Sequence, residues 1–381
     1  MKKIKYVGYY DIQGNAAENR NYALSATNKM TYIISALAKI GYNIDIISAS
    51  ETKNNQGYPG KTIKIDDTTN LKLFKTFKLG NKLNKFISII SLKVFLILHL
   101  MINIKRNESV ILYHSLAYLS IFKFLKKIKK FNLILEVEEV YADVINSDKY
   151  RKKEYDYFKY ADAYIFPTEL LNDKINTDNK PYTIIYGTYQ VEPDRDCKFN
   201  DGKIHCVYAG TFQPEKGGSS AAVDTAQYLN GDYHIHIIGA GSEKDERALL
   251  EHINEISNKT ECTLTFDGLK SGDEYTKFIQ SCDIGFSTQN PNGMYNDTSF
   301  PSKVLSYMAN GLRVVSVRIK ALETSAVNDY LYYYENNTPE AIAETVKNIS
   351  LNDGYHSRKL IKELDTKFTK DLNIIIRNFE V

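Results

Sequence analysis

The sequence predicts an α/β protein built from two Rossmann-like domains, each with a doubly wound parallel sheet. Short apolar runs alternate with helical patterns along the whole chain. The runs are continuous rather than alternating, which is typical of parallel strands buried on both faces. A polar segment near residue 190 divides the series in two. A hydrophobic fraction of 43% with 25% charged residues excludes a disordered chain.

The first half contains six apolar runs that we expect to form strands, at 4–10, 43–48, 110–115, 133–137, 162–167 and 182–187. Helical patterns lie between them, at 22–40, 85–104, 117–130, 149–161 and 169–176. We therefore expect an N-terminal domain over 1–190.

The second half repeats the pattern after the polar linker 190–202. Its expected strands are 203–210, 233–239, 262–268, 282–288, 313–317 and 330–335. We place a second domain over 191–355 and a long helix over 356–381, which we expect to return toward the N-terminal domain.

The four cysteines and the N-terminus both favour a cytoplasmic protein. No two cysteines form a CxxC pair, so neither a zinc site nor a redox motif is predicted. Lys5, Gly8 and Asp11 interrupt the apolar core that a signal peptide requires. We interpret the N-terminus as the first strand of a mature cytosolic protein.

Charge is distributed unevenly between the halves. Residues 1–190 carry 29 Lys and Arg against 18 Asp and Glu, and the remainder carries 20 against 28. Many of the lysines fall in two series, over 72–85 and 123–130. They are either the solvated faces of helices or a surface attracted to membrane headgroups or phosphates.

The apolar segment 86–104 follows the first lysine series directly. Its 19 residues nearly reach the length that spans a bilayer. Lys93 and His99 lie inside it, and a lysine near the centre of a spanning helix costs about 2.5–3.5 kcal/mol. We expect a core helix or a helix lying on a membrane surface.

Three polar clusters follow strand ends in the second half. Gly210 ends a strand and precedes Lys216, Gly217 and Gly218 at a helix start, a pattern that binds phosphate or merely caps the helix. The second cluster is Gly239-Ala240-Gly241, which is too short for a dinucleotide fingerprint.

The third cluster is Pro301-Ser302-Lys303, at the start of another helix. Since the carboxyl ends of parallel strands share one edge of a sheet, we expect the three clusters to form one site for an anionic ligand.

These motifs resemble the donor domain of GT-B glycosyltransferases, most closely the retaining family 4. The matching pieces are Gly210 through Lys216-Gly217, Gly239-Ala240-Gly241, and Ser306 through Val315. Three positions depart from the family pattern, because Thr211 replaces its arginine while Thr298 and Ser306 replace its two glutamates.

The resemblance implies two domains facing a cleft, a nucleotide-sugar donor, and retention of anomeric configuration without a metal ion. Lys216 would stabilise the leaving diphosphate. The donor-binding residues it implies are Gly210, Thr211, Gly217, Gly239, Gly241, Ser302, Lys303 and Ser306.

Acceptor contacts are expected from the first half. His114 ends a strand and is either a catalytic contact in the cleft or a structural, hydrogen-bonded histidine. Glu138 and Glu139 follow the next strand, where they would bind sugar hydroxyls, act as a base, or be solvated scaffolding. The loop with Gly14, Asn15 and Arg20 would line the acceptor site.

The function that these observations favour is sugar transfer from a nucleotide-sugar to a glycan, lipid-linked or protein-linked acceptor, in surface polysaccharide or glycoconjugate synthesis. The alternatives are a non-catalytic GT-B-like binding or stabilising subunit, or a sugar-nucleotide epimerase or dehydrogenase. We expect no cofactor, no metal, no nucleic-acid partner, and a cytoplasmic location, peripheral on the inner face of an anionic membrane.

Overall fold

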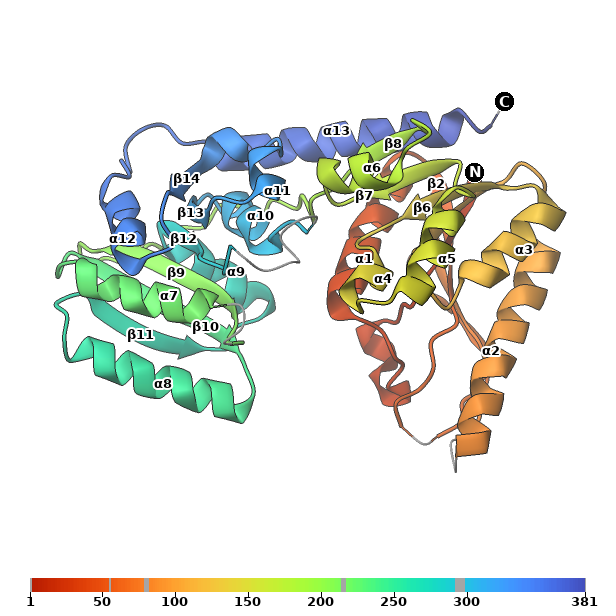
Figure 1. Cartoon of the computed structure of the whole chain (residues 1–381), viewed down its shortest axis with the longest axis horizontal. Coiled ribbons are helices and arrows are strands. Elements are labelled where there is room, and N and C mark those ends of the chain that lie inside the picture. Colours follow the sequence, from red (N-terminus) through yellow and green to blue (C-terminus); the bar gives the residue numbers. More distant parts are fainter. Residues whose placement is uncertain (1, 55, 79–81, 214–216, 292–298, 381) are drawn as a thin grey trace. The chain divides into compact units, whose positions relative to one another are not determined.

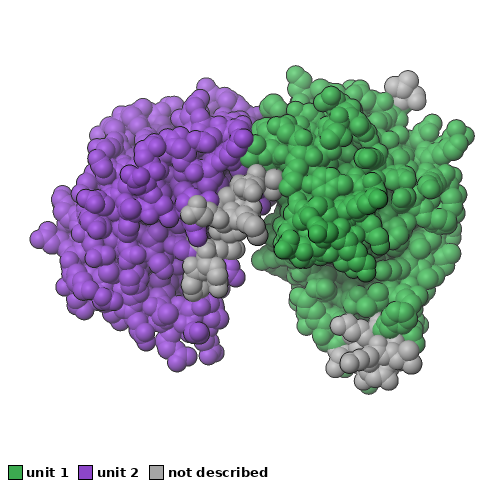
Figure 2. All heavy atoms as spheres, viewed as in Figure 1, with its two compact units in different colours: residues 1–185, 366–381 green, residues 186–365 purple. Residues whose placement is uncertain are grey.

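The computed structural model describes residues 2–54, 56–78, 82–213, 217–291 and 299–380. The chain forms two compact units, unit 1 with residues 1–185 and 366–381, and unit 2 with residues 186–365 (Figure 2). The first division falls between Ile185 and Tyr186, beside the predicted boundary at 190. Helix α13 (Ser357–Arg377) belongs to both units, because its residues from Thr366 onward are counted in unit 1.

Unit 1 contains one eight-stranded sheet (Figure 1). Its strands, in spatial order, are β3 (Lys61–Lys64), β4 (Thr69–Leu73), β2 (Tyr42–Ser48), β1 (Lys2–Val7), β5 (Ser109–Tyr113), β6 (Asn132–Glu136), β7 (Ala163–Phe166) and β8 (Tyr182–Ile184). All neighbours pair in parallel except β3 with β4. Its helices are η1 (Gln13–Glu18), α1 (Leu24–Lys39), α2 (Lys82–Asn103), α3 (Leu119–Lys129), α4 (Tyr141–Val144), α5 (Asp148–Phe158) and α6 (Glu169–Ile175).

Unit 2 contains a six-stranded parallel sheet. Its strands, in spatial order, are β11 (Thr263–Gly268), β10 (Tyr233–Ala240), β9 (Ile204–Thr211), β12 (Ile284–Ser287), β13 (Arg313–Val317) and β14 (Leu331–Tyr334). Its helices are α7 (Gly218–Thr225), η3 (Ala226–Tyr228), α8 (Glu243–Ser257), α9 (Gly272–Ser281), α10 (Ser302–Ala309), α11 (Lys320–Glu323), η5 (Asn328–Tyr330) and α12 (Pro339–Lys347).

The two sheets confirm the predicted fold class of paired parallel-sheet domains. In each sheet the chain first builds strands on one side of its first strand and then moves to the other side. The strand order therefore reverses between β1 and β5 in unit 1, and between β9 and β12 in unit 2. Such reversal points open a crevice at the carboxyl ends of the strands, where α/β proteins bind ligands.

The region 50–80 differs from the sequence prediction. The lysine series is interpreted either as the solvated face of a helix or as a surface attracted to anions, and the helical interpretation is wrong for Lys72. This residue lies in strand β4, which pairs with β2 and β3. Leu71 and Leu73 point into the core on the other face of that short strand. Two alternating strands of four and five residues leave too weak a period to be distinguished from a lysine-rich helix.

Helix α2 has one face in the core of unit 1. Leu92, Leu96, Leu100 and Ile104 follow each other at intervals of four and are almost completely buried in the hydrophobic cluster that contains Val110 of β5. The helix meets the length and hydropathy expected of a membrane span over Phe86–Asn103, yet this packing gives it a place beside the sheet.

Candidate functional site

A pocket of about 800 Å³ lies at the carboxyl edge of the unit 2 sheet, where the strand order reverses. Strand ends supply Tyr208–Thr211 from β9 and Ile238–Ala240 from β10. The remaining lining residues come from loops and helix starts: Gly218, Leu269, Lys270, Tyr275, Gln289, Ser299, Phe300, Pro301, Ser302, Lys303 and Ser306.

Two glycines let backbone segments meet at the base of this pocket. Gly239 has a φ of +139°, and a Cβ added there would lie only 1.8 Å from the carbonyl oxygen of Gly210. A Cβ on Gly218 would lie 2.9 Å from the Tyr208 ring and 3.0 Å from the carbonyl oxygen of Thr288. Because a side chain at either position would collide with a neighbour, the strand ends can approach closely only with glycine there.

Tyr307 fixes the position of α10 beside these strands. Its buried hydroxyl accepts a hydrogen bond from the amide of Ala209 at 2.7 Å and donates to the carbonyl of Phe286 at 3.4 Å. Its ring occupies the space that a Cβ on Gly285 would fill, at 2.4 Å from that point. The first turn of α10 is thereby held at the pocket.

Two cationic side chains and the N-terminus of α10 line the pocket. Lys303 Nζ lies 4.1 Å from the centroid of the Tyr208 ring, and Ser302 is exposed at the first position of α10. Lys270 also lines the pocket, with its Nζ donating to Glu274 Oε1 at 3.0 Å. Two ammonium groups beside a helix N-terminus attract an anion such as a phosphate.

Ser306 and Tyr275 form the neutral wall of the pocket. Their hydroxyl oxygens lie 2.9 Å apart, so that one donates to the other. Burial raises the pKa of Tyr275. The pair therefore stays uncharged near pH 7 and offers hydroxyl groups to a polar ligand.

Unit 1 has a cluster of acidic and phenolic groups at the carboxyl ends of β1 and β6. The Tyr6 hydroxyl donates to Glu136, whose side chain is fully buried. Burial, together with the charge of Glu138, raises the pKa of Glu136 to about 8. Lys29 donates to Glu138 at 2.9 Å, and burial with the same neighbouring charge raises the pKa of Glu139.

Comparisons with a protein-family model and with solved structures relate this fold to known proteins. Residues 203–352 match the family model of glycosyl transferases group 1. This match covers the sheet and pocket of unit 2, and the fold of the whole chain is shared with solved structures of two-domain GT-B enzymes. Unit 2 therefore carries a glycosyl transferases group 1 domain, and the chain has the GT-B fold.

The solved structures share the fold at low sequence identity. A UDP-forming α,α-trehalose-phosphate synthase from Burkholderia xenovorans is 10% identical, with a TM-score of 0.68, and the match covers 100% of both chains. A trehalose-6-phosphate protein from E. coli bound with UDP-2-fluoro glucose is 11% identical, with a TM-score of 0.64 and 99% of both chains covered. The HepE protein of Anabaena in complex with UDP and glucose is 10% identical, with a TM-score of 0.62, covering 99% of this chain and 100% of that one. No curated protein sequence matches the chain significantly.

The pocket of unit 2 brings together most of the predicted donor residues. Gly210, Thr211, Gly239, Ser302, Lys303 and Ser306 all line it. Gly217 precedes it, as the N-cap of α7 with a φ of +64°. Gly241 lies beyond the strand end and is exposed, outside the described lining. Lys216 and Thr298 lie outside the described residues.

Sequence reasoning missed Tyr208, Lys270 and Tyr275. Lys270 comes two residues after the end of β11, so the same strand-end rule that selected the glycines would have selected it. Tyr208 and Tyr275 carry no such signal, because aromatic residues in a strand or helix indicate a core position in the absence of other information.

Two expected acceptor residues of unit 1 are corrected by the structure. Arg20 is 1% exposed, and its guanidinium donates to Glu18 at 2.7 Å and to the carbonyls of Ser50 and Phe74 at 3.1 Å, so it holds the loop together instead of lining an open site. Asn15 is likewise buried and donates to both carboxylate oxygens of Asp11 at 3.0 Å.

Gly14, in the same loop, is exposed, and a Cβ there would meet only Ile12 Cδ1, at the ordinary contact distance of 4.0 Å. A glycine is therefore not needed at this position for close approach, and its acceptor role stays a prediction.

His114 lies in the core rather than in an open crevice. It is 1% exposed, and its Nε2 lies 2.6 Å from Glu154 Oε1. The same buried carboxylate accepts from the amides of Tyr141 and Ala142 at 2.9 and 2.7 Å. These contacts support the structural interpretation of His114 over the expected contact with an acceptor, because the ring is buried and hydrogen-bonded to a buried carboxylate.

Proposed function

We propose that unit 2 binds a nucleotide-sugar donor in the pocket at the ends of β9 and β10, and that the enzyme transfers the sugar to a glycan, lipid-linked or protein-linked acceptor. The observation that carries this proposal is the convergence of Lys303, Lys270, the α10 N-terminus and the close-packed glycines on one pocket of about 800 Å³. Support also comes from structural relatives described with UDP-2-fluoro glucose and with UDP and glucose.

The chemistry of the pocket suits departure of a nucleoside diphosphate. Cleavage of the sugar–phosphate bond places negative charge on the leaving phosphate, and ammonium groups fixed in a partly desolvated pocket stabilise that charge. Lys303 on α10 and Lys270 after the end of β11 provide these ammonium groups. The transfer step we propose therefore requires no metal ion, and the resemblance to family 4 favours retention.

In unit 1, Glu138 and Glu139 remain the carboxylates we propose for contact with acceptor hydroxyls. Both are half-buried and follow the end of β6, at the carboxyl edge of that sheet. Surface polysaccharide or glycoconjugate synthesis is the biological role we propose.

A panel of UDP-, GDP- and dTDP-sugars tests the donor assignment, with donor hydrolysis measured by release of the nucleotide and products identified by mass spectrometry. We expect hydrolysis of at least one donor and weaker turnover in the Lys303→Ala variant. Failure of the whole panel to bind in calorimetry would contradict the donor assignment.

The non-catalytic alternative has one specific observation in its favour. Thr211 and Ser306 stand where the family has an arginine and a glutamate, so two charged contacts to the donor are missing. Saturable binding of a nucleotide-sugar without hydrolysis or transfer, in the presence of candidate acceptors, would favour a binding subunit over an enzyme.

We further propose that unit 1 docks on an anionic membrane through helix α2, at the inner face of the cytoplasmic membrane. A stripe of large apolar side chains runs along α2 at intervals of four residues and is 43–80% exposed: Phe86, Ile90, Val94, Leu98 and Ile102. Helix α3 contacts α2 and exposes Phe124 and Ile128. A soluble monomer rarely leaves so continuous an apolar patch uncovered.

The charges beside these helices match the proposed membrane. Lys93 on α2 and Lys123, Lys127 and Lys130 on or next to α3 are exposed. Each basic residue close to an anionic leaflet contributes about 1 kcal/mol of attraction, which salt screens. Apolar and basic groups on the same two helices are the pattern of an interfacial helix.

Sedimentation with vesicles tests this docking. We expect binding to vesicles containing phosphatidylglycerol, weaker binding at high salt, and little binding to neutral phosphatidylcholine vesicles. If anionic vesicles at low salt do not sediment the protein, the acceptor must be sought among soluble glycans or proteins.

A further inference from the structure

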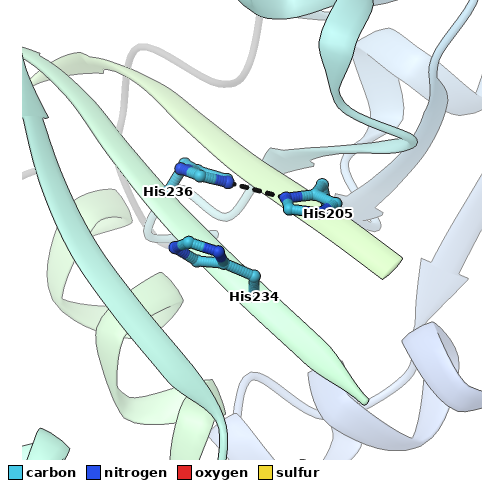
Figure 3. Close-up of side chains that lie close together, drawn as sticks. All are labelled: His205, His234 and His236. Atoms are coloured by element: carbon cyan, nitrogen blue, oxygen red, sulfur yellow. Dashed lines mark hydrogen bonds between the residues drawn. The ribbon is translucent and has the colours of Figure 1, made fainter. Parts of the chain in front are cut away.

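Three histidines of unit 2 meet on one face of its sheet, away from the donor pocket. His205 lies on β9, and His234 and His236 lie on the neighbouring strand β10 (Figure 3). One nitrogen from each ring lies within 4.8 Å of the others. Phe199 stacks on His205, with ring centroids 4.1 Å apart, and Phe278 packs edge-on against His236.

The outer nitrogens of all three rings have acceptors as partners. His205 Nε2 lies 2.9 Å from Asp201 Oδ1, and His236 Nδ1 lies 3.0 Å from Asp267 Oδ2. Thr265 donates its hydroxyl proton to Asp267 at 2.8 Å, so that its oxygen accepts from His234 Nε2 at 3.0 Å. Because ionised carboxylates only accept hydrogen bonds, each outer nitrogen carries a proton.

The inner nitrogens are therefore left with their lone pairs. His205 Nδ1 and His236 Nε2 face each other at 2.9 Å, as the dashed line in Figure 3 marks. Two lone pairs at this distance repel each other unless a cation stands between them. The cation is either one additional proton shared by the rings or a metal ion.

We propose that His205 Nδ1, His236 Nε2 and His234 Nδ1 bind a divalent transition-metal ion, for which Zn²⁺ is the best match. Three histidines are a known zinc ligand set, and imidazole nitrogen suits zinc, copper and nickel. Asp201 and Asp267 then act as the carboxylates that orient ligand histidines and fix their protonated nitrogen.

The geometry requires only small adjustments to take the ion. Zn–N distances of 2.0–2.1 Å in a tetrahedron separate two nitrogens by about 3.3 Å, so the His205 and His236 rings would move apart by about 0.4 Å. His234 is nearly parallel to His236, with centroids 3.8 Å apart and planes inclined by 23°, and its ring would rotate to direct Nδ1 at the ion. Half-buried His234 and the exposed Asp201 give the cluster access to solvent.

A metal here would stabilise structure and take no part in sugar transfer. His205 and His234 lie near the starts of their strands, whereas the donor pocket is lined by the ends of the same strands. The ion would join β9 to β10, and through Asp201 and Phe199 it would hold the segment that precedes β9 against the sheet.

Metal analysis of the full-length protein tests the proposal. The protein is purified without a polyhistidine tag and without chelator, then analysed by inductively coupled plasma mass spectrometry. Chelator-treated protein is titrated with Zn²⁺ against a competing chelator, and its melting temperature is followed. We expect about one equivalent of metal and a rise of several degrees in melting temperature at saturating Zn²⁺.

Matched variants show whether the three histidines hold the ion. His205→Gln and His236→Gln should each lose saturable binding, while His234→Gln should weaken it at least tenfold. His252→Gln is the control, because His252 lies in the same unit and bonds to a carboxylate, Asp224, at 2.7 Å without belonging to the cluster.

Two outcomes overturn the proposal. One is wild-type protein that neither retains metal nor binds Zn²⁺ saturably, which would leave a proton between the rings. The other is binding in the cluster variants as tight as in the His252→Gln control. If the buried variants fail to fold, the His234→Gln variant and the visible spectrum of the wild-type protein with added Co²⁺ test whether the histidines bind a metal ion. An unchanged spectrum on adding Co²⁺ excludes nitrogen ligation.

Discussion

Replacing two exposed side chains at the end of α2 separates a membrane-docking face from an incidental apolar surface. Leu98 and Ile102 are 54% and 80% exposed, which together equals about 1.3 fully exposed side chains. Burying one such side chain completely contributes about 1.5–3 kcal/mol. The double variant Leu98→Ser/Ile102→Ser should therefore lose about 3 kcal/mol of transfer free energy, or roughly 100-fold in vesicle affinity.

The matched control is Val144→Ser/Ile145→Ser. These residues are 62% and 53% exposed in the same unit, but they lie at α4 rather than on α2. Binding to phosphatidylglycerol vesicles is measured by sedimentation across a lipid titration, with melting temperatures to verify folding. The reasoning would be refuted if the α2 variant bound vesicles as tightly as the wild-type protein. It would also be refuted if the α2 variant and the control lost the same amount of affinity.

Three further predictions concern the donor pocket and the acidic cluster. Lys303→Ala should weaken binding of the nucleotide about 10- to 100-fold in calorimetry, because a charge-assisted hydrogen bond contributes about 1.5–3 kcal/mol. Unchanged binding would show that Lys303, which lies over the Tyr208 ring, makes no contact with the nucleotide. Gly239→Ala should destabilise unit 2 by about 2–4 kcal/mol, since its Cβ would lie 1.8 Å from the Gly210 oxygen, and an unaltered melting temperature would contradict this. Burial raises the pKa of folded Glu136 to about 8, whereas the unfolded side chain loses its proton near its ordinary pKa of 4.5. The unfolded state therefore binds fewer protons, and wild-type stability should fall by about 1.4 kcal/mol per pH unit between pH 5 and 8. Glu136→Gln should remove that part of the slope in denaturation measured at pH 5.5 and 7.5, and identical slopes would show that the side chain is already ionised in the folded protein.

The sequence predicted what depends on local pattern. Continuous apolar runs identified twelve of the fourteen strands in the described part of the chain, and the strand-end rule placed Gly210, Gly239 and Lys303 in one pocket. It failed for β3 and β4, where short strands with alternating side chains resemble a lysine-rich helix. It also failed for Arg20, because nothing local shows that a charged side chain will be surrounded by carbonyl groups.

The histidine cluster shows a second kind of limit. His234 and His236 are two residues apart in a predicted strand, so the sequence alone places them on the same face of the sheet. His205 becomes their neighbour only through the pairing of β9 with β10. Likewise, whether α2 is a core helix or an interfacial helix could not be decided from its hydropathy. The structure gives it both an inner stripe in the core and an outer apolar stripe.

The division of helix α13 between the units affects the order in which the chain can fold. Unit 2 is continuous in sequence, whereas unit 1 takes its last 16 residues from the far end of the chain. There Phe368 packs against Tyr32, and Glu380 accepts from the Tyr42 hydroxyl at 2.8 Å. During synthesis, unit 1 emerges first yet cannot be completed until the C-terminus has left the ribosome, when unit 2 is already made. A chain that stops after unit 2 would thus leave the earlier unit with an uncovered groove, while the later one has its whole sequence.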